Sequence, residues 1–164
     1  MAACGRAPGD TLTLGATSFD LVQYHFHAPS EHTLSGRRYP MEMHMVHRSA
    51  AGRLAVVGRA HRRRPAQPRV RAGLEQPAAR QGRGDALRAR HGRRGRAAAV
   101  IPRSYRYQGS LTTPPCTEGV EWVVLSTPIE LDRQQIGTFG AIIHGNSRPV
   151  QALNGRTVLA DVVH

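Results

Sequence analysis

Apolar and polar residues alternate over several short stretches of the chain, a pattern typical of β-strands with one buried face. Turn residues such as Gly15 and Pro29 separate these stretches. We therefore expect strands at residues 11–14, 19–27, 39–47, 54–57, 105–107 and 121–125. Within residues 39–47, the alternation places three methionines on the face opposite Glu42 and His44.

A helical period is clearest over residues 132–143. Ile136 and Phe139 are roughly helix-spaced there, and Asp132 can cap the first turn. Residues 148–159 are expected to close the chain in extended and turn structure. The pattern predicts a mainly β fold with few short helices, and 164 residues suffice for one domain with a core.

The middle of the chain breaks this pattern. Residues 59–98 contain three large apolar residues, whereas the preceding 40 positions contain 14. Such a segment buries too little apolar surface to offset the entropy lost on ordering. We expect residues 59–99 to be an atypical arginine-rich segment, disordered or loosely helical, within the single domain 1–164.

The same segment carries most of the formal net charge of +12. All 23 basic residues are arginine, and 13 of them lie in residues 59–96 beside only two acids, so the rest of the chain is nearly neutral. The charge is therefore a poor argument for nucleic-acid binding by the whole chain. The segment itself has no aromatic residue for base stacking.

The two cysteines, Cys4 and Cys116, form neither a disulfide framework nor a CxxC metal pair. No run of signal-peptide or membrane-spanning length is present in the sequence as given, so we expect a cytoplasmic protein without membrane association.

Three histidines suggest a metal site. His25 and His27 lie two residues apart in a predicted strand and so share a face, and a neighbouring strand can bring His44 beside them. Three neutral imidazoles leave one zinc coordination position open, as in catalytic sites. Gln23 and Glu42 share these faces and are candidate hydrogen-bond partners of the ligands. The spacing alone also allows a polar, solvated sheet face.

Several runs of residues make the pattern more specific. They are residues 21–33 (LVQYHFHAPSEHT), residues 39–47 (YPMEMHMVH), residues 110–119 (SLTTPPCTEG), residues 146–151 (NSRPVQ) and residues 153–156 (LNGR). Together they resemble the α-class carbonic anhydrases of bacterial type, over about residues 8–58 and 101–159. The resemblance implies a partial α-carbonic anhydrase fold, a large, mostly antiparallel sheet with zinc at the bottom of a cone-shaped cleft.

It also implies a reaction. His25, His27 and His44 would hold Zn²⁺, which lowers the pKa of a bound water to near 7, and the resulting hydroxide would hydrate CO₂ to bicarbonate. Thr112 would accept a hydrogen bond from the hydroxide and donate its own proton to Glu31.

The substrate would rest on an apolar wall that suits an uncharged molecule. The resemblance assigns this wall to Val46, Val56, Leu111, Val120 and Trp122. Thr113 would border the substrate, and the backbone N–H of Thr112 would bind one of its oxygens.

The chain also departs from the family. We expect the N-terminal portion that precedes the zinc strand, with its proton-shuttling histidine, to be missing. Residues 59–99 are explained either by compensating frameshifts or by a basic insertion. Two alternatives to an active enzyme therefore remain, an inactive remnant that at most binds zinc and a basic nucleic-acid-binding protein.

Overall fold

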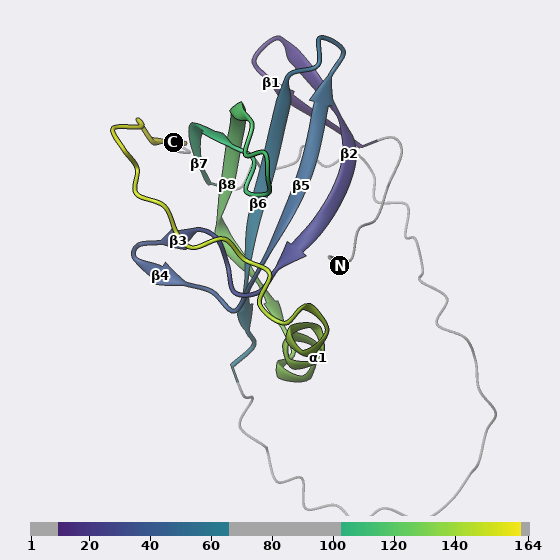
Figure 1. The fold of residues 1–164 in the computed structure, drawn as a ribbon, viewed down its shortest axis with the longest axis vertical. Helices are drawn as coiled ribbons and strands as arrows, with labels where there is room; N and C mark the ends of the chain where they lie inside the picture. Colours follow the sequence, from purple (N-terminus) through teal and green to yellow (C-terminus); the bar gives the residue numbers. More distant parts are fainter. Residues whose placement is uncertain (1–9, 66–102, 162–164) are drawn as a thin grey trace, which may run out of the picture. The chain divides into compact units, whose positions relative to one another are not determined.

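A seven-stranded sheet carries most of the structure, a computed structural model that describes residues 10–65 and 103–161 (Figure 1). The strands of this sheet follow the order β1-β2-β5-β6-β8-β7-β9, and only β6 and β8 pair in parallel. Their bounds are β1 (Thr11–Leu14), β2 (Thr17–His27), β5 (Met41–Ser49), β6 (Leu54–Arg63), β7 (Ser104–Ser110), β8 (Glu118–Leu131) and β9 (Leu159–Ala160). Strands β3 (Thr33–Leu34) and β4 (Arg37–Arg38) form a separate small hairpin. The predicted fold class, mainly β with a mostly antiparallel sheet, is confirmed.

The strand register follows the alternation of the sequence. His25 of β2 lies opposite His44 of β5, which in turn lies opposite Gly58 of β6. A bulge between Leu21 and Gln23 shifts the register of β2 just before the histidines. Side chains opposite one another in a ladder point to the same face, so the predicted division of β5 into a histidine face and a methionine face is confirmed.

Several strands are longer than the sequence indicated, and β6 and β8 exceed their expected ranges by the most. We expected the strand at residues 54–57 to end before an unstructured segment, but β6 continues to Arg63. It does so because β5 pairs with one of its edges and β8 with the other, which outweighs the unfavourable local sequence. The expectation for residues 59–63 is therefore wrong, whereas residues 66–99 lie outside the described residues. Strand β8 likewise exceeds the expected 121–125 and runs from Glu118 to Leu131.

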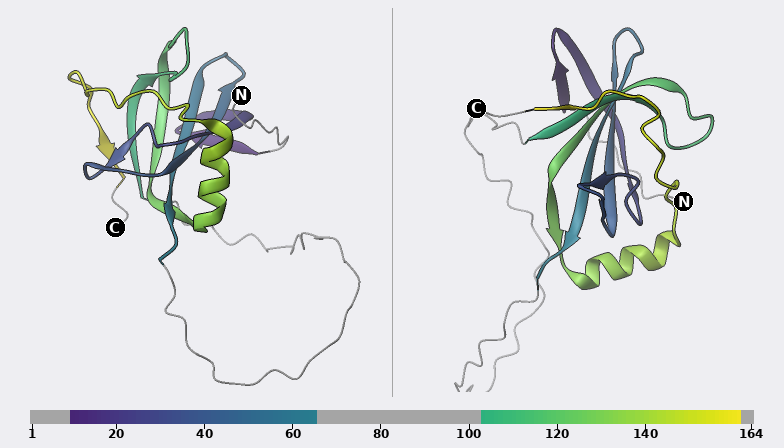
Figure 2. Two further views of the ribbon diagram at one scale, coloured as in Figure 1. Left: turned by 60° about the horizontal axis from the view of Figure 1, so that its bottom comes forward. Right: turned by 90° about the vertical axis from the view of Figure 1, so that its left-hand side faces the viewer.

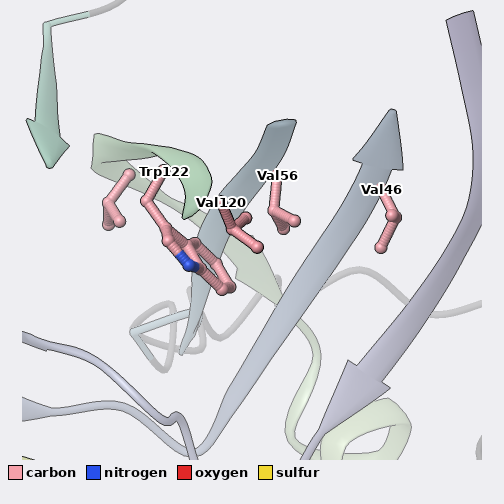
Figure 3. Packing of buried hydrophobic residues seen from close by; sticks show 5 residues of the cluster. Val46, Val56, Val120 and Trp122 are labelled. Atoms are coloured by element: carbon pink, nitrogen blue, oxygen red, sulfur yellow. The ribbon is translucent and has the colours of Figure 1, made fainter. Parts of the chain in front are cut away.

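Apolar side chains gather on both faces of the sheet. On the histidine face, one cluster joins Val46, Val56, Val120, Trp122 and Val124 (Figure 3). The opposite face holds a second cluster of Val57, Val123 and Leu125. The first cluster comes from β5, β6 and β8, so its walls are strands with hydrogen-bonded neighbours on both sides.

Helix α1 (Arg133–Ile143) forms where the helical period was predicted. The Asp132 carboxylate accepts a hydrogen bond from the backbone N–H of Gln134 at 2.6 Å, and Gln135 completes a capping box. Phe139 packs edge-on against Phe26 of β2, with ring centroids 5.0 Å apart. The helix therefore lies at the end of β2 that carries the histidines (Figure 2). No helix of the described residues is both long and apolar enough to span a membrane.

Candidate metal centre

The three predicted metal ligands come together on one face of the sheet. His25 and His27 project from the end of β2, and His44 projects from β5 directly opposite His25. One nitrogen from each imidazole lies within 4.8 Å of the others. His27 and His44 are almost fully buried, and His25 is partly buried. The alternation of two adjacent strands thus suffices to gather this group.

Hydrogen bonds fix which nitrogen each of two histidines can offer. Nδ1 of His27 lies 3.3 Å from the backbone oxygen of Asn146, whereas Nε2 of His27 is buried without a hydrogen-bond partner. In His44 the two nitrogens have the opposite roles. Nε2 lies 3.1 Å from Oε1 of Glu42, so Nδ1 is the nitrogen that can bind a metal. A buried imidazole nitrogen without a partner costs free energy unless something binds it, and a metal ion fits this position.

The electrostatics also favour metal binding. Burial, followed by the charges of His44 and His27, lowers the pKa of His25 to about 4. Burial and then His44 also lower the pKa of His27. These imidazoles are therefore neutral near pH 7, which is the form that coordinates zinc.

Glu42 is a buried carboxylate in hydrogen-bonding contact with four groups of three residues. Its Oε2 accepts from the backbone N–H groups of Glu31 and His32, both at 2.9 Å. Its Oε1 lies 2.6 Å from Nδ1 of His32 and 3.1 Å from Nε2 of His44. Burial alone would raise the pKa of Glu42, but the hydrogen bonds from His32 and His44 outweigh it and hold this pKa well below its usual range. Glu42 is therefore an anion in hydrogen-bonding contact with Nε2 of His44.

Glu31 lies beside the histidines with half of its carboxylate satisfied. Oε1 accepts a hydrogen bond from the backbone N–H of Arg148 at 2.7 Å and lies 3.3 Å from Nδ1 of His27. Oε2 is buried without a hydrogen-bond partner, so the hydrogen bond expected from Thr112 does not reach this oxygen. Thr112 is partly buried in the loop between β7 and β8, and Thr113 is exposed.

The predicted apolar wall forms one cluster beside the histidines. Val46, Val56, Val120 and Trp122 belong to it together with Val124, and Leu111 packs against it. The indole N–H of Trp122 donates to the backbone oxygen of Ser110 at 3.0 Å, and its ring lies 4.8 Å from that of His44 between centroids. An apolar surface is thus in direct contact with a candidate metal ligand.

Some residues of the site were not identified from the sequence. His32 joins Glu42 to the hydroxyl of Tyr107, and Asn146 holds β2 by accepting from the N–H of Ala28 and donating to the oxygen of Phe26. The signal for Asn146 was its place in the run 146–151. Gln23, expected beside His25, lies on the histidine face opposite Val46.

Comparisons with known proteins agree with this geometry. The family model of the eukaryotic-type carbonic anhydrases matches residues 8–65 and 96–162. The interval between the two matches falls inside the arginine-rich segment. A carbonic anhydrase of Pectobacterium carotovorum is 39% identical over 157 residues, which cover 93% of this chain and 63% of that protein. The chain therefore spans less than two thirds of the length of this relative.

Solved structures give the same result. The α-carbonic anhydrase of Thermovibrio ammonificans, in complex with the inhibitor sulfanilamide, is 37% identical with a TM-score of 0.63, over 88% of this chain and 64% of that one. A hyperthermostable carbonic anhydrase from a hydrothermal vent chimney is 34% identical with a TM-score of 0.72, over 97% of this chain and 72% of that one.

Proposed function

Because the chain belongs to the family of eukaryotic-type carbonic anhydrases, we propose that it hydrates carbon dioxide reversibly to bicarbonate at a zinc ion held by His25, His27 and His44. The observation that carries this proposal is the group of three buried or partly buried imidazoles in contact with an apolar cluster. When bound, zinc supplies a Lewis acid that makes water a nucleophile near neutral pH.

The histidines are prepared for this role by their partners. Asn146 leaves Nε2 of His27 available, and Glu42 leaves Nδ1 of His44 available. Gln23 is the partner proposed for His25. Because the ring orientations are set before metal binds, little conformational entropy is lost on coordination.

Thr112 and Glu31 would orient the attacking water. The buried Oε2 of Glu31 has no hydrogen-bond partner, and an unsatisfied buried acceptor costs about 1–3 kcal/mol. The Thr112 hydroxyl does not reach this oxygen in the structure, and it is the donor that we propose for it in the zinc-loaded chain. With its proton committed to Glu31, the hydroxyl can only accept from the water, which fixes the direction of the water's lone pair.

Carbon dioxide would lie against the apolar cluster. The proposed wall consists of Val46, Val56, Leu111, Val120 and Trp122. These side chains offer dispersion contacts and exclude competing water, which suits a substrate without charge. The backbone N–H of Thr112 would hold one substrate oxygen, with Thr113 at the border.

The test compares two identical substitutions in the full 164-residue chain. His44→Asn removes a proposed ligand, whereas His144→Asn changes an exposed histidine at the left-handed end of α1, a conformation that asparagine tolerates. We expect the zinc-loaded chain to hydrate CO₂ in a stopped-flow assay, the His144 variant to match it and the His44 variant to lose turnover. Zinc binding with no rate above the His44 variant would reject the enzyme in favour of an inactive remnant.

A further inference from the structure

A chain of side-chain hydrogen bonds links the metal site to strand β7. The hydroxyl of Tyr107 lies 2.6 Å from Nε2 of His32, and Nδ1 of His32 lies 2.6 Å from Oε1 of Glu42. The same Oε1 lies 3.1 Å from Nε2 of His44. Four side chains from β7, the segment after β2, and β5 are thus connected up to one candidate ligand.

The chemistry of these groups gives the chain a direction. A carboxylate only accepts hydrogen bonds, so Nδ1 of His32 and Nε2 of His44 are both donors to Glu42. In the neutral imidazole of His32, Nε2 then accepts from Tyr107. Burial, and then the charge of Glu42, raise the pKa of Tyr107, so its hydroxyl keeps the hydrogen that it donates.

Aromatic packing holds the same chain in place. Tyr107 stacks on Trp122 with an interplanar angle of 5° and centroids 6.1 Å apart. The ring of His32 lies 4.9 Å from that of Trp122 between centroids. Trp122 is 2% exposed, so these rings have little room to move.

We propose that His32 and Tyr107 are positioning residues of the metal site, which fix the carboxylate of Glu42 so that Nδ1 of His44 stays directed at the ion. The proposal depends on one part of the proposed function, the binding of a metal ion by His44. Two donors share Oε1 of Glu42, and the shorter contact belongs to His32. Without that donor, Oε1 of Glu42 loses a constraint and interacts with His44 alone, while Oε2 keeps its two backbone N–H donors. The freed oxygen changes both the orientation and the basicity of the ligand.

Two substitutions of His32, one smaller with a donor and one of similar volume without a donor, separate hydrogen bonding from space filling. His32→Asn retains an amide N–H close to the position of Nδ1, whereas His32→Leu has a similar volume and no donor. Tyr107→Phe removes only a hydroxyl. Tyr105→Phe is its matched control, because Tyr105 is on the same strand and packs against the same apolar cluster.

The measurements are the zinc dissociation constant, by competition with a chromophoric chelator, and the visible spectrum of the cobalt-substituted chain. We expect about tenfold weaker zinc binding for His32→Leu, the lower end of the range for partners of metal ligands. Binding should weaken about threefold for Tyr107→Phe and for His32→Asn, as for a single modest hydrogen bond. Tyr105→Phe should bind as the parent does, and the cobalt spectrum should change in the first three variants alone.

Each other outcome has a defined meaning. If His32→Asn and His32→Leu weaken zinc binding equally, the ring of His32 only fills space. If zinc affinity is unchanged in all variants, Glu42 needs no support from His32 or Tyr107. Either result overturns the proposal. Zinc binding with the expected order but no CO₂ hydration would reject the proposed function and leave the positioning role standing. A parent chain that binds no zinc overturns both. The urea midpoint of each metal-free variant identifies those that do not fold.

Discussion

Gly58 shows how one missing side chain shapes the candidate metal site. A Cβ at this position would lie 2.9 Å from Oε1 of Glu42 and 3.6 Å from the ring of Trp122. The carboxylate cannot easily retreat, because two backbone N–H groups hold its other oxygen. We predict that Gly58→Ala weakens zinc binding about tenfold and destabilises the chain by about 1–3 kcal/mol, measured by chelator competition and urea denaturation.

Gly137 provides the control for this substitution. It lies within α1, and a Cβ there would have no neighbour within 4 Å. Gly137→Ala should leave zinc affinity unchanged and stabilise the chain by up to about 1 kcal/mol, because alanine favours the helix. An equal loss of affinity in both variants would mean that the close approach of Gly58 to Glu42 is unimportant.

Residues of the site were predictable to the extent that they lie close in sequence. Alternation alone placed His25, His27 and His44 on one face. His25 and His27 need only a regular strand between them, and His44 needs only the pairing of that strand with its neighbour. The bond between His27 and Asn146 joins residues 119 positions apart, and that between His32 and Tyr107 joins residues 75 apart. Such pairs depend on the whole topology, which no local pattern contains.

At the scale of elements, α1 and β6 illustrate the same distinction. The helix was predicted correctly because its cap and its period are local signals. The end of β6 was missed because its sequence is arginine-rich there, and the strand exists through pairing on both sides. Tertiary pairing therefore forces His61 into a buried position, 3% exposed, with Nδ1 unsatisfied.

This buried position predicts an acid-sensitive strand. Burial, and then the charge of Arg59, lower the pKa of His61 in the folded chain. An unfolded histidine has a pKa of about 6.5, so the unfolded state binds more protons below that pH and stability falls as the pH decreases. We predict that the free energy of unfolding of the metal-free His61→Leu variant declines less between pH 7 and pH 5 than that of the parent.

The same variant should also gain about 1 kcal/mol at pH 7, because an unsatisfied buried nitrogen is removed. His144→Asn, at an exposed histidine, should retain the acid-side slope of the parent in urea titrations at each pH. Parallel slopes for the parent and His61→Leu would show that His61 titrates with an ordinary pKa in the folded chain.

At the scale of the whole molecule, the site connects distant parts of the chain. The candidate ligands lie on β2 and β5, and their hydrogen-bond partners come from β5, β7 and the segment after α1. The apolar cluster beside them is built by β5, β6 and β8. Residues from both sides of the arginine-rich segment therefore contribute to one centre. A metal that binds only when these parts are assembled must stabilise all of them together.

Zinc should therefore raise the global stability of the chain in a single transition. A ligand that binds only the folded state at 100 times its dissociation constant adds about 2.7 kcal/mol. We expect zinc to shift the urea midpoints measured by Trp122 fluorescence and by far-ultraviolet circular dichroism equally, because Trp122 packs beside His44 and the sheet carries the dichroism signal. His144→Asn should retain the shift and His44→Asn should lose it. If zinc moves the fluorescence midpoint alone, metal binding organises only the surroundings of the histidines, and the two halves of the sheet fold independently of it.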